Sequence, residues 1–175
     1  MTESVAPSLE PDPAHAGLRF RRPAVHDHAR VLAVIPGWWN LPGTADLGRL
    51  LPRLFFQHFA DTSTIVEDED GLAGFLIGFR SASQPGVAYI HFVGVRPDLR
   101  TSGLARTLYE RFFDAMRASG CRRVDAITGP RNVGSQRFHR AMGFEATGDT
   151  EIEGVPSWRD YDGPGEHRVA FTRRL

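Results

Sequence analysis

Apolar residues in the second half of the chain recur with a helical period. They return every four positions, at Leu104, Leu108, Phe112 and Met116. This spacing places them on one face of a helix, because an α-helix has about 3.6 residues per turn. The pattern predicts a long helix over 103–119 that buries that face.

The first half of the chain contains two weaker helical patterns. Residues 24–35 are expected to form a short helix that stops at Pro36-Gly37. Residues 45–59 are also helical in pattern, but Pro52 lies inside them. Because proline lacks the N–H that a helix interior needs, we expect a kink there or a break into two short helices.

Runs of β-branched and aromatic residues predict strands at 18–24, 62–70, 71–83, 87–95, 122–128, 143–149 and 167–175. Asp70-Gly71 is a strong hairpin signal between the second and third of these strands. A second helix is predicted over 132–142, from an N-cap at Asn132 to a stop at Gly143. This order of strands and helices indicates an α/β fold with one sheet of mixed strand directions.

Length and composition favour one folded domain. The 175 residues are 41% hydrophobic, and we expect a disordered N-terminal tail over 1–17 followed by a single domain over 18–175. The chain has 21 basic and 21 acidic residues, so it lacks the cationic excess typical of proteins that bind nucleic acid or an anionic membrane. With no apolar run of about 18 residues and no signal peptide pattern, a cytoplasmic location is expected.

Several kinds of chemistry are excluded by residue type. Cys121 is the single cysteine, so neither an internal disulfide nor a cysteine-based zinc site can form, and it is expected to be structural. All basic residues are arginine, so no lysine can form a Schiff base. No cluster of His, Cys and carboxylates has ligand spacing, so no metal is predicted.

The segment 93–112 carries the strongest functional signal. A strand leads through a loop into a helix whose first residues are small: Ser102, Gly103 and Ala105. The first N–H groups of a helix have no partner within it and lie at the positive end of its dipole, so they can bind an anion such as a pyrophosphate. Arg100 and Arg106 add positive charge on either side. The alternative is that Gly103 only shapes a tight turn.

Two motifs in this part of the chain resemble those of the GNAT superfamily of acetyl-CoA-dependent N-acetyltransferases. Residues 100–105 fit Q/R-x-x-G-x-G/A after Val95-Arg96-Pro97, and residues 132–144 fit N-x-x-S-x-x-[FL]-[YH]-x-x-x-G-F. The resemblance covers about 18–175. It implies a central, twisted, mostly antiparallel sheet of about seven strands flanked by helices, splayed between the fourth and fifth strands, 87–95 and 122–128.

The resemblance also implies how acetyl-CoA would be bound. The backbone of the fourth strand would pair with the pantetheine arm, and Gly94 would ease the distortion at the splay. The amides at the helix start would hold the pyrophosphate, and two side chains of the later helix would touch the cofactor. The expected cofactor-binding residues are Val93, Gly94, Val95, Arg100, Thr101, Ser102, Gly103, Leu104, Ala105, Arg106, Asn132 and Ser135.

The catalytic residues are less sharply indicated. His139 stands where many family members have a tyrosine that protonates the departing thiolate; the alternative is that it only packs there. His91 is the best candidate for a general base, acting through water, with Asp125 weaker; the alternative is that His91 is a hydrogen-bonded structural residue and that the reaction proceeds without a dedicated base. The N–H of Val93 is the expected donor to the thioester carbonyl.

In this family the acceptor site is formed by the first helices, their loop and the last hairpin. The resemblance points to an aromatic pocket with carboxylates for a cationic amine. The alternative is that the aromatic residues are core and the acidic residues belong to turns. The candidate residues are Trp38, Trp39, Asn40, Phe55, Phe56, His58, Phe59, Tyr89, Trp158, Asp160, Tyr161 and Asp162.

The predicted activity is N-acetylation of a primary amine of a small molecule, amino acid or peptide. Direct attack in a ternary complex is expected, with acetyl-CoA as co-substrate and without metal, nucleic acid or membrane. Because the tyrosine is replaced and the fourth strand has no carboxylate, a non-catalytic acyl-CoA sensor is the alternative function. Association as a homodimer is left open.

Overall fold

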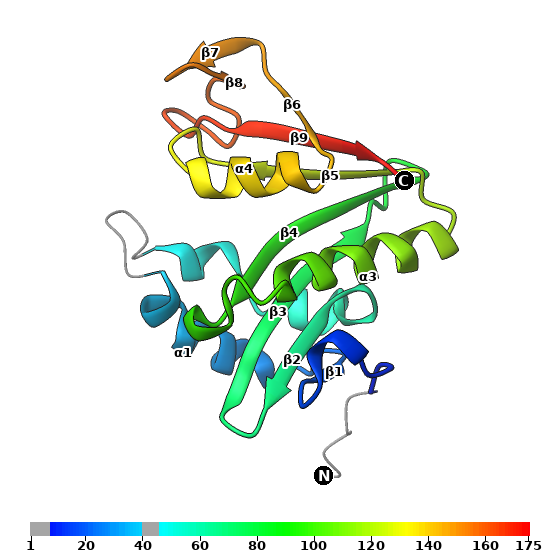
Figure 1. Ribbon diagram of the computed structural model, residues 1–175. Coiled ribbons are helices and arrows are strands. Elements are labelled where there is room, and N and C mark those ends of the chain that lie inside the picture. The colour runs from blue at the N-terminus through cyan, green and yellow to red at the C-terminus, as the bar shows by residue number, and fades with distance from the viewer. Residues whose placement is uncertain (1–7, 40–45) are drawn as a thin grey trace. The chain divides into compact units, whose positions relative to one another are not determined.

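The computed structural model describes residues 8–39 and 46–175 (Figure 1). The described elements are η1 (Pro13–His15), β1 (Arg19–Arg21), α1 (Asp27–Trp38), η2 (Leu47–Leu50), α2 (Leu54–His58), η3 (Ala60–Thr62), β2 (Thr64–Asp68), β3 (Gly71–Arg80), β4 (Val87–Val95), η4 (Pro97–Leu99), α3 (Leu104–Ala118), β5 (Arg123–Thr128), α4 (Val133–Ala141), β6 (Glu145–Thr147), β7 (Thr150–Ile152), β8 (Val155–Ser157) and β9 (Val169–Arg174).

Seven of the strands form one sheet in the order β1-β2-β3-β4-β5-β9-β6. The neighbours β4 and β5 are parallel, whereas β2 is antiparallel to β1 and β3, and β9 is antiparallel to β5 and β6. The register of β4 with β5 covers Val87–Ile90 and Arg123–Ala126, and both strands continue past it, to Val95 and Thr128. The predicted α/β fold with a seven-stranded, mostly antiparallel sheet is confirmed.

The chain divides into two compact units. One comprises residues up to Phe79 together with Phe92–Phe112, and the other comprises Arg80–His91 together with Phe113–Leu175. In the first unit, successive residues of β3 contact different helices. Phe75 packs in a core with residues of α1 and α2, while a Cβ on Gly74 would lie 3.3 Å from Leu104 of α3. The two sides of this part of the sheet are therefore covered by different helices.

Helix α1 extends beyond the predicted stop. The expected end at Pro36-Gly37 is wrong, because α1 includes both residues and ends at Trp38. Proline removes one N–H from the last turn, but Trp39 still donates to the carbonyl of Ile35 at 3.0 Å, and Trp38 is buried. Burial of Trp38 thus favours one more turn than the local sequence predicts.

Other turns match their sequence signals. Residues 45–59 form two short helices, η2 and α2, on either side of Pro52. A break into two helices was one of the two outcomes expected there. The hairpin between β2 and β3 turns at Glu69-Asp70, one residue before the predicted Asp70-Gly71, and Gly71, which pairs with Asp68, has φ of 110°. This left-handed conformation is accessible to glycine at little cost.

Part of the segment assigned to a tail makes defined contacts. Residues 1–7 lie outside the described residues, whereas His15 is buried and its Nε2 lies 3.0 Å from Oγ1 of Thr107 on α3. Arg111 of α3 donates to the carbonyl of Glu10 and lies over the ring of Phe20 at 4.5 Å. Residues 8–17 are thereby attached to α3 within the first unit.

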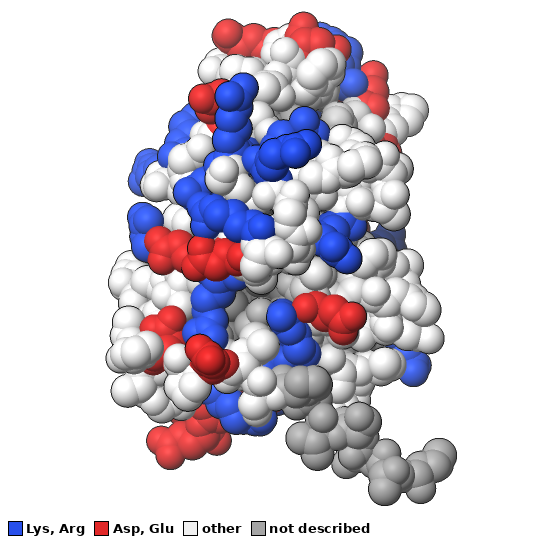
Figure 2. Space-filling view, turned by 90° about the vertical axis from the view of Figure 1, so that its right-hand side faces the viewer, with Lys and Arg blue, Asp and Glu red and all other residues white. Residues whose placement is uncertain are grey.

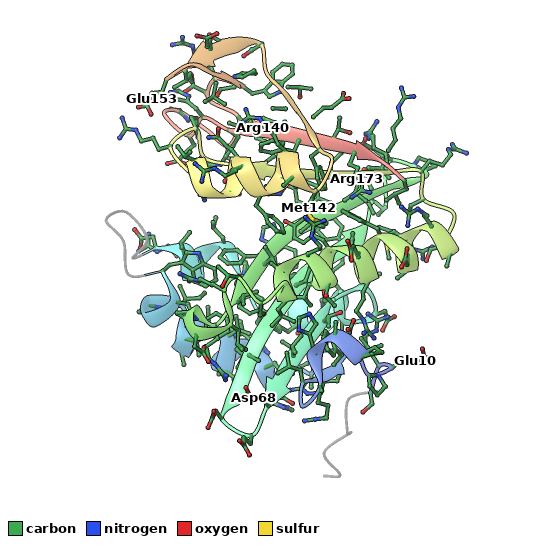
Figure 3. All side chains as sticks on the ribbon, viewed as in Figure 1. Glu10, Asp68, Arg140, Met142, Glu153 and Arg173 are labelled. Atoms are coloured by element: carbon green, nitrogen blue, oxygen red, sulfur yellow. The ribbon has the colours of Figure 1, made fainter. Side chains whose placement is uncertain are left out.

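In the second unit, α4 covers one face of β5 and β9. Phe171, Ala126 and Ile90 are register partners and therefore share that face. Arg173 of β9 donates to the carbonyl of Met142, just after α4, at 2.5 Å (Figure 3), and its guanidinium lies 4.2 Å from the ring centroid of Phe113. These contacts fix the end of α4 against the sheet.

One hairpin was missed by the sequence analysis. Strands β7 and β8 pair as a separate two-stranded sheet joined by Glu153 and Gly154, whose φ angles are 54° and 78°. Two successive positive φ values are typical of a type I′ hairpin turn. A β-branched residue on each side of Glu153-Gly154 was the available signal.

A buried ion-pair network joins β1, α1 and β2. Arg21 makes a bidentate pair with Asp27 at 2.6 and 2.7 Å, and it also donates to both carboxylate oxygens of Glu67 at 2.7 and 3.0 Å. Arg30 bridges the same two carboxylates at 2.8 and 2.5 Å. The hydrogen bonds from Arg21, and to a smaller extent the hydrogen bond from Arg30, lower the pKa of Glu67 to about 2 despite its burial.

On the face of the molecule drawn in Figure 2, arginine and acidic side chains are intermixed.

The lowered pKa of Glu67 predicts a specific dependence of stability on pH. A carboxyl group with a lowered pKa stabilises the fold fully above its unfolded value near 4.5, and this contribution is lost as the pH falls toward 2. Glu67→Gln should lower the free energy of unfolding at pH 7 by about 3 kcal/mol and flatten its decline below pH 4.5. Urea unfolding of both proteins between pH 7 and pH 3 measures this; two parallel curves would contradict it.

Candidate active site

The end of β4 leads directly into the start of α3. Residues 97–99 form η4, after which Thr101 and Gly103 both adopt left-handed backbone conformations, with φ of 74° and 89°. For a threonine this conformation costs roughly 1 kcal/mol. The chain thus reverses within a few residues, so that α3 begins at Leu104 immediately beside the end of the strand.

Backbone N–H groups are available where α3 begins. The N–H of Thr107 bonds within the helix, to the carbonyl of Gly103 at 3.0 Å, and Ser102 Oγ accepts from the N–H of Leu104 at 3.3 Å. No hydrogen bond of the described residues uses the N–H of Gly103, and α3 offers no internal acceptor for its next two N–H groups, those of Ala105 and Arg106. Residues 101–103 are exposed, and nothing lies within 4 Å of a Cβ built on Gly103. The geometry is suited to an anion.

Arginines flank this helix start in different ways. Arg106 is more than half exposed, and its guanidinium lies 3.7 Å from Glu110 on the next turn. Arg100, by contrast, donates through Nη2 to the carbonyl oxygen of Trp38 and through Nε to that of Val95 at 3.4 Å. The side chain of Arg100 thus joins the loop to the ends of β4 and α1.

Gly94 on β4 is required by close packing. A Cβ at this position would lie 2.5 Å from Cε1 of Phe75 and 2.6 Å from Cη2 of Trp39. Trp39 also packs edge-on against Phe92, with ring centroids 5.4 Å apart. The expected role of Gly94, to ease a strand distortion, is thus joined by a steric one that the sequence did not reveal.

In the second unit, Asn132 caps α4. Its Oδ1 accepts the N–H of Ser135 at 3.0 Å, as predicted for an N-cap. Asn132 is exposed and Ser135 half-buried, so both remain accessible to a ligand.

His139 lies on the buried face of α4. Its ring stacks on Phe171, with centroids 4.7 Å apart and planes 13° apart, and meets Phe144 edge-on. Nδ1 lies 2.8 Å from the carbonyl of Ser135, which requires an N–H on this nitrogen. Burial lowers the pKa of His139, against the opposing effect of that hydrogen bond. A neutral imidazole is a weak acid, so these surroundings favour the packing role over proton donation.

A half-buried polar group lies on the opposite face of the second unit's sheet. Tyr89, Asp125 and Thr172 are register partners, and Thr172 donates to Asp125 at 2.8 Å. His91 is two residues from Tyr89 on the same side, with ring centroids 6.4 Å apart. His91 and His139 therefore lie on different faces of this sheet.

The last loop of the chain contributes charges near Tyr89. Burial, and then the proximity of Tyr161 and Asp162, raise the pKa of the Tyr89 phenol well above its usual range, while Arg168 opposes them. Arg168 pairs with Asp162 at 2.7 Å. The predicted residues Tyr89, Tyr161 and Asp162 are thus brought together. Arg168, which the sequence analysis missed, joins them, and its position opposite Trp158 across the loop was not readable from any motif.

The remaining acceptor candidates have varied surroundings. Trp38 and Phe56 are core residues, 7% and 1% exposed, and Phe55 and Phe59 stack with Phe79. Asp160 accepts the N–H of Gly165 at 2.7 Å and so serves the turn. His58 is exposed and Trp158 is 37% exposed, whereas Asn40 lies outside the described residues.

Within 8–39 and 46–175, no group of three or more His, Cys, Asp or Glu side chains could hold a metal ion. No described helix is long and apolar enough to cross a membrane. Cys121 is buried.

A strand that leads through a small-residue loop to an open helix start is typical of proteins that bind a phosphate-bearing ligand. Residues 32–144 match the model of the acetyltransferase (GNAT) family, and the chain belongs to this family. It is an acetyltransferase.

Individual relatives agree with this assignment. The chain is 24% identical over 157 residues to L-2,4-diaminobutyric acid acetyltransferase of Halalkalibacterium halodurans, covering 88% of this chain and 79% of the relative. It is 32% identical over 107 residues to aminoglycoside N(6')-acetyltransferase type 1 of Salmonella typhimurium, covering 51% and 73%. The solved diaminobutyrate acetyltransferase EctA of Paenibacillus lautus, in complex with L-2,4-diaminobutyric acid and coenzyme A, has the same fold (TM-score 0.63, 24% identity, 89% and 93% covered).

Substitution of Gly94 tests the packing above β4. Gly94→Ala places a methyl group against Phe75 and Trp39, and overpacking of this kind costs about 1–3 kcal/mol. The expected result is a lower melting temperature, measured by differential scanning calorimetry, with Gly37→Ala as the control because nothing lies within 4 Å of a Cβ there. Equal melting temperatures of the Gly94→Ala and parent proteins would refute the steric role.

His139→Phe distinguishes packing from proton donation. If the ring only packs between Phe171 and Phe144, the variant should lose less than about threefold in kcat, since general acid catalysis contributes about 10²–10⁴-fold where it operates. Initial rates at saturating substrate measure this. A loss of 100-fold or more in a variant with a native near-ultraviolet circular dichroism spectrum would instead establish the acid role.

Proposed function

We propose that this chain transfers an acetyl group from acetyl-CoA to a primary amine of a small molecule. The observation that carries the proposal is the start of α3, where Thr101 and Gly103 adopt left-handed conformations in an exposed loop and the N–H of Gly103 has no hydrogen bond among the described residues. Such N–H groups can hold a pyrophosphate without any lysine, and the chain has none.

Each cofactor-binding residue has a proposed part. The N–H groups over 101–106 hold the pyrophosphate, and Arg106 adds charge. The backbone of Val93, Gly94 and Val95 pairs with the pantetheine arm in the manner of an added strand. Asn132 and Ser135 contact the cofactor from α4, where Asn132 retains its amide N–H donors because its Oδ1 is the cap acceptor.

The reaction joins the amine nitrogen to the thioester carbonyl carbon and breaks the carbon–sulfur bond. The amine must be neutral to attack, and the N–H of Val93 is the proposed donor to the developing oxyanion. The attacking nitrogen loses a proton, with His91 assisting through water, and the departing thiolate takes up a proton. Since the surroundings of His139 favour a neutral ring, we do not assign it the delivery of that proton.

We place the acceptor on the half-buried face of β4 and β5 in the second unit. Tyr89 and His91 supply aromatic surface there, and Asp125 and Asp162 supply negative charge. This combination suits a small amine that arrives with positive charge. The relatives named for diaminobutyric acid and for an aminoglycoside support an acceptor of this class.

Cofactor binding tests the proposal first. Coenzyme A should bind saturably in titration calorimetry. Gly103→Ala should weaken this binding at least about tenfold, because alanine is strained in the left-handed backbone conformation of residue 103 at the anion site. Gly120→Ala is the matched control, because Gly120 has φ of 82° and equally open surroundings at the other end of α3. Absence of saturable binding would overturn both the transferase proposal and the sensor alternative.

Turnover separates those two functions. Acetyl-CoA is incubated with a panel of small amines, and released thiol is titrated. The expected result is thiol release with at least one cationic amine. Tight cofactor binding without release on any amine would favour the sensor.

A further inference from the structure

The side chain of Arg100 joins two segments that are far apart in the sequence. Its Nη2 donates to the carbonyl oxygen of Trp38, and its Nε to that of Val95 at 3.4 Å. Trp38 is the last residue of α1, Val95 is the last residue of β4, and Arg100 itself begins the loop before α3. All three lie in the first unit, so the contact belongs to one compact body.

The carbonyl group at the end of α1 is a favourable partner for an arginine. The last carbonyls of a helix lack partners within the helix and lie at the negative end of its dipole. Pro36 further weakens this last turn by removing one N–H. A guanidinium at this point satisfies a carbonyl that the helix cannot, so Arg100 stabilises the end of α1.

The tryptophans at the end of α1 are fixed against the sheet. Trp38 stacks on Phe75, with ring centroids 5.9 Å apart, and Trp39 lies over Gly94 and against Phe92 of β4. The same stretch of β4 is the proposed partner of the pantetheine arm. Through Arg100, the end of α1 is held to the cofactor loop as well as to the strand.

The cofactor loop in turn depends on an anchor. Thr101, the residue after Arg100, adopts a left-handed conformation that non-glycine residues rarely take. Such a conformation persists only where its surroundings hold it. The two hydrogen bonds of Arg100 fix the loop immediately before this residue.

We propose that Arg100 is a positioning residue that couples the cofactor loop to the end of α1, rather than a ligand of the cofactor phosphates. The inference rests on the proposed function. Occupation of the loop by coenzyme A then also fixes Trp38 and Trp39, and with them the stretch of β4 that carries Val93, the proposed oxyanion donor. Arg100 acts on acceptor use, whereas Arg106, which faces solvent on α3, acts on phosphate affinity.

The two roles are separated by donors with and without phosphates. Acceptor kcat/KM is measured at saturating acetyl-CoA and at saturating S-acetylpantetheine, which lacks the pyrophosphate. Arg100→Met should lower it by about fivefold or more with acetyl-CoA, because coupling between sites is typically of this size, and by less than about twofold with S-acetylpantetheine, which leaves the loop unoccupied. Arg106→Met should weaken binding of acetyl-CoA but not of S-acetylpantetheine. Arg117→Met, at the far end of α3, is the surface-charge control.

A second readout does not depend on activity. In a Trp158→Phe background, only Trp38 and Trp39 report by fluorescence. Coenzyme A should change this emission when Arg100 is present, and Arg100→Met should bind coenzyme A with a much smaller change. Arg100→Lys, which keeps a donor, should restore part of the change and also covers the case in which Arg100→Met folds poorly.

The outcomes distinguish the two proposals. If the parent protein shows no saturable binding of coenzyme A, the proposed function fails. If the parent binds and turns over but Arg100→Met loses only affinity for acetyl-CoA, with an unchanged acceptor kcat/KM at saturating acetyl-CoA and an unchanged fluorescence response, the coupling role alone is overturned.

Discussion

The availability of backbone N–H groups at the start of α3 is the constraint on which the account of this protein depends. A helix can offer these groups only if the preceding chain turns away sharply, and here two left-handed residues make that turn. The strand before the turn is fixed by aromatic packing over Gly94, and the loop is fixed by Arg100. Cofactor binding, in this account, is a property of backbone geometry that side chains maintain.

The two faces of the second unit's sheet differ in chemistry. One carries His139, Phe144 and Phe171 in a stacked, buried group that supports α4. The other carries Tyr89, Asp125 and the charged residues of the last loop, which are partly exposed. Alternation along β4 and β5 produces this separation, because adjacent residues of a strand point to opposite faces. A shift of one residue in the register of β4 with β5 would move core side chains to the polar face and polar side chains to the core.

Much of this fold could be predicted because its signals are local. The period of α3, the cap at Asn132 and the hairpin signalled by Asp70-Gly71 each require only neighbouring residues, and all three elements are confirmed. The end of α1 could not be predicted in this way. Burial of Trp38 against Phe75 overrides the effect of Pro36, and Phe75 lies on a strand 37 positions away. Asp27 and Glu67 likewise have the sequence pattern of surface carboxylates, yet they are buried by arginines from other elements.

The candidate site also has a part that could be predicted from the sequence and a part that could not. The strand, loop and helix start were located from motif spacing, since these segments are contiguous. The sequence could not assign the partners of Arg100 or the contacts of Gly94, because both are long-range. Arg168 was missed for the same reason: its pairing with Asp162 arises from how the last loop closes.

Amide proton and nitrogen chemical shifts provide the most direct measurement of the central claim. On titration with coenzyme A, the largest shifts should fall on the N–H groups of residues 101–106, whereas pantetheine, which lacks the linked phosphates, should leave them nearly unmoved. If coenzyme A binds and these amides do not shift, or if pantetheine shifts them equally, phosphate is held elsewhere and the account is contradicted.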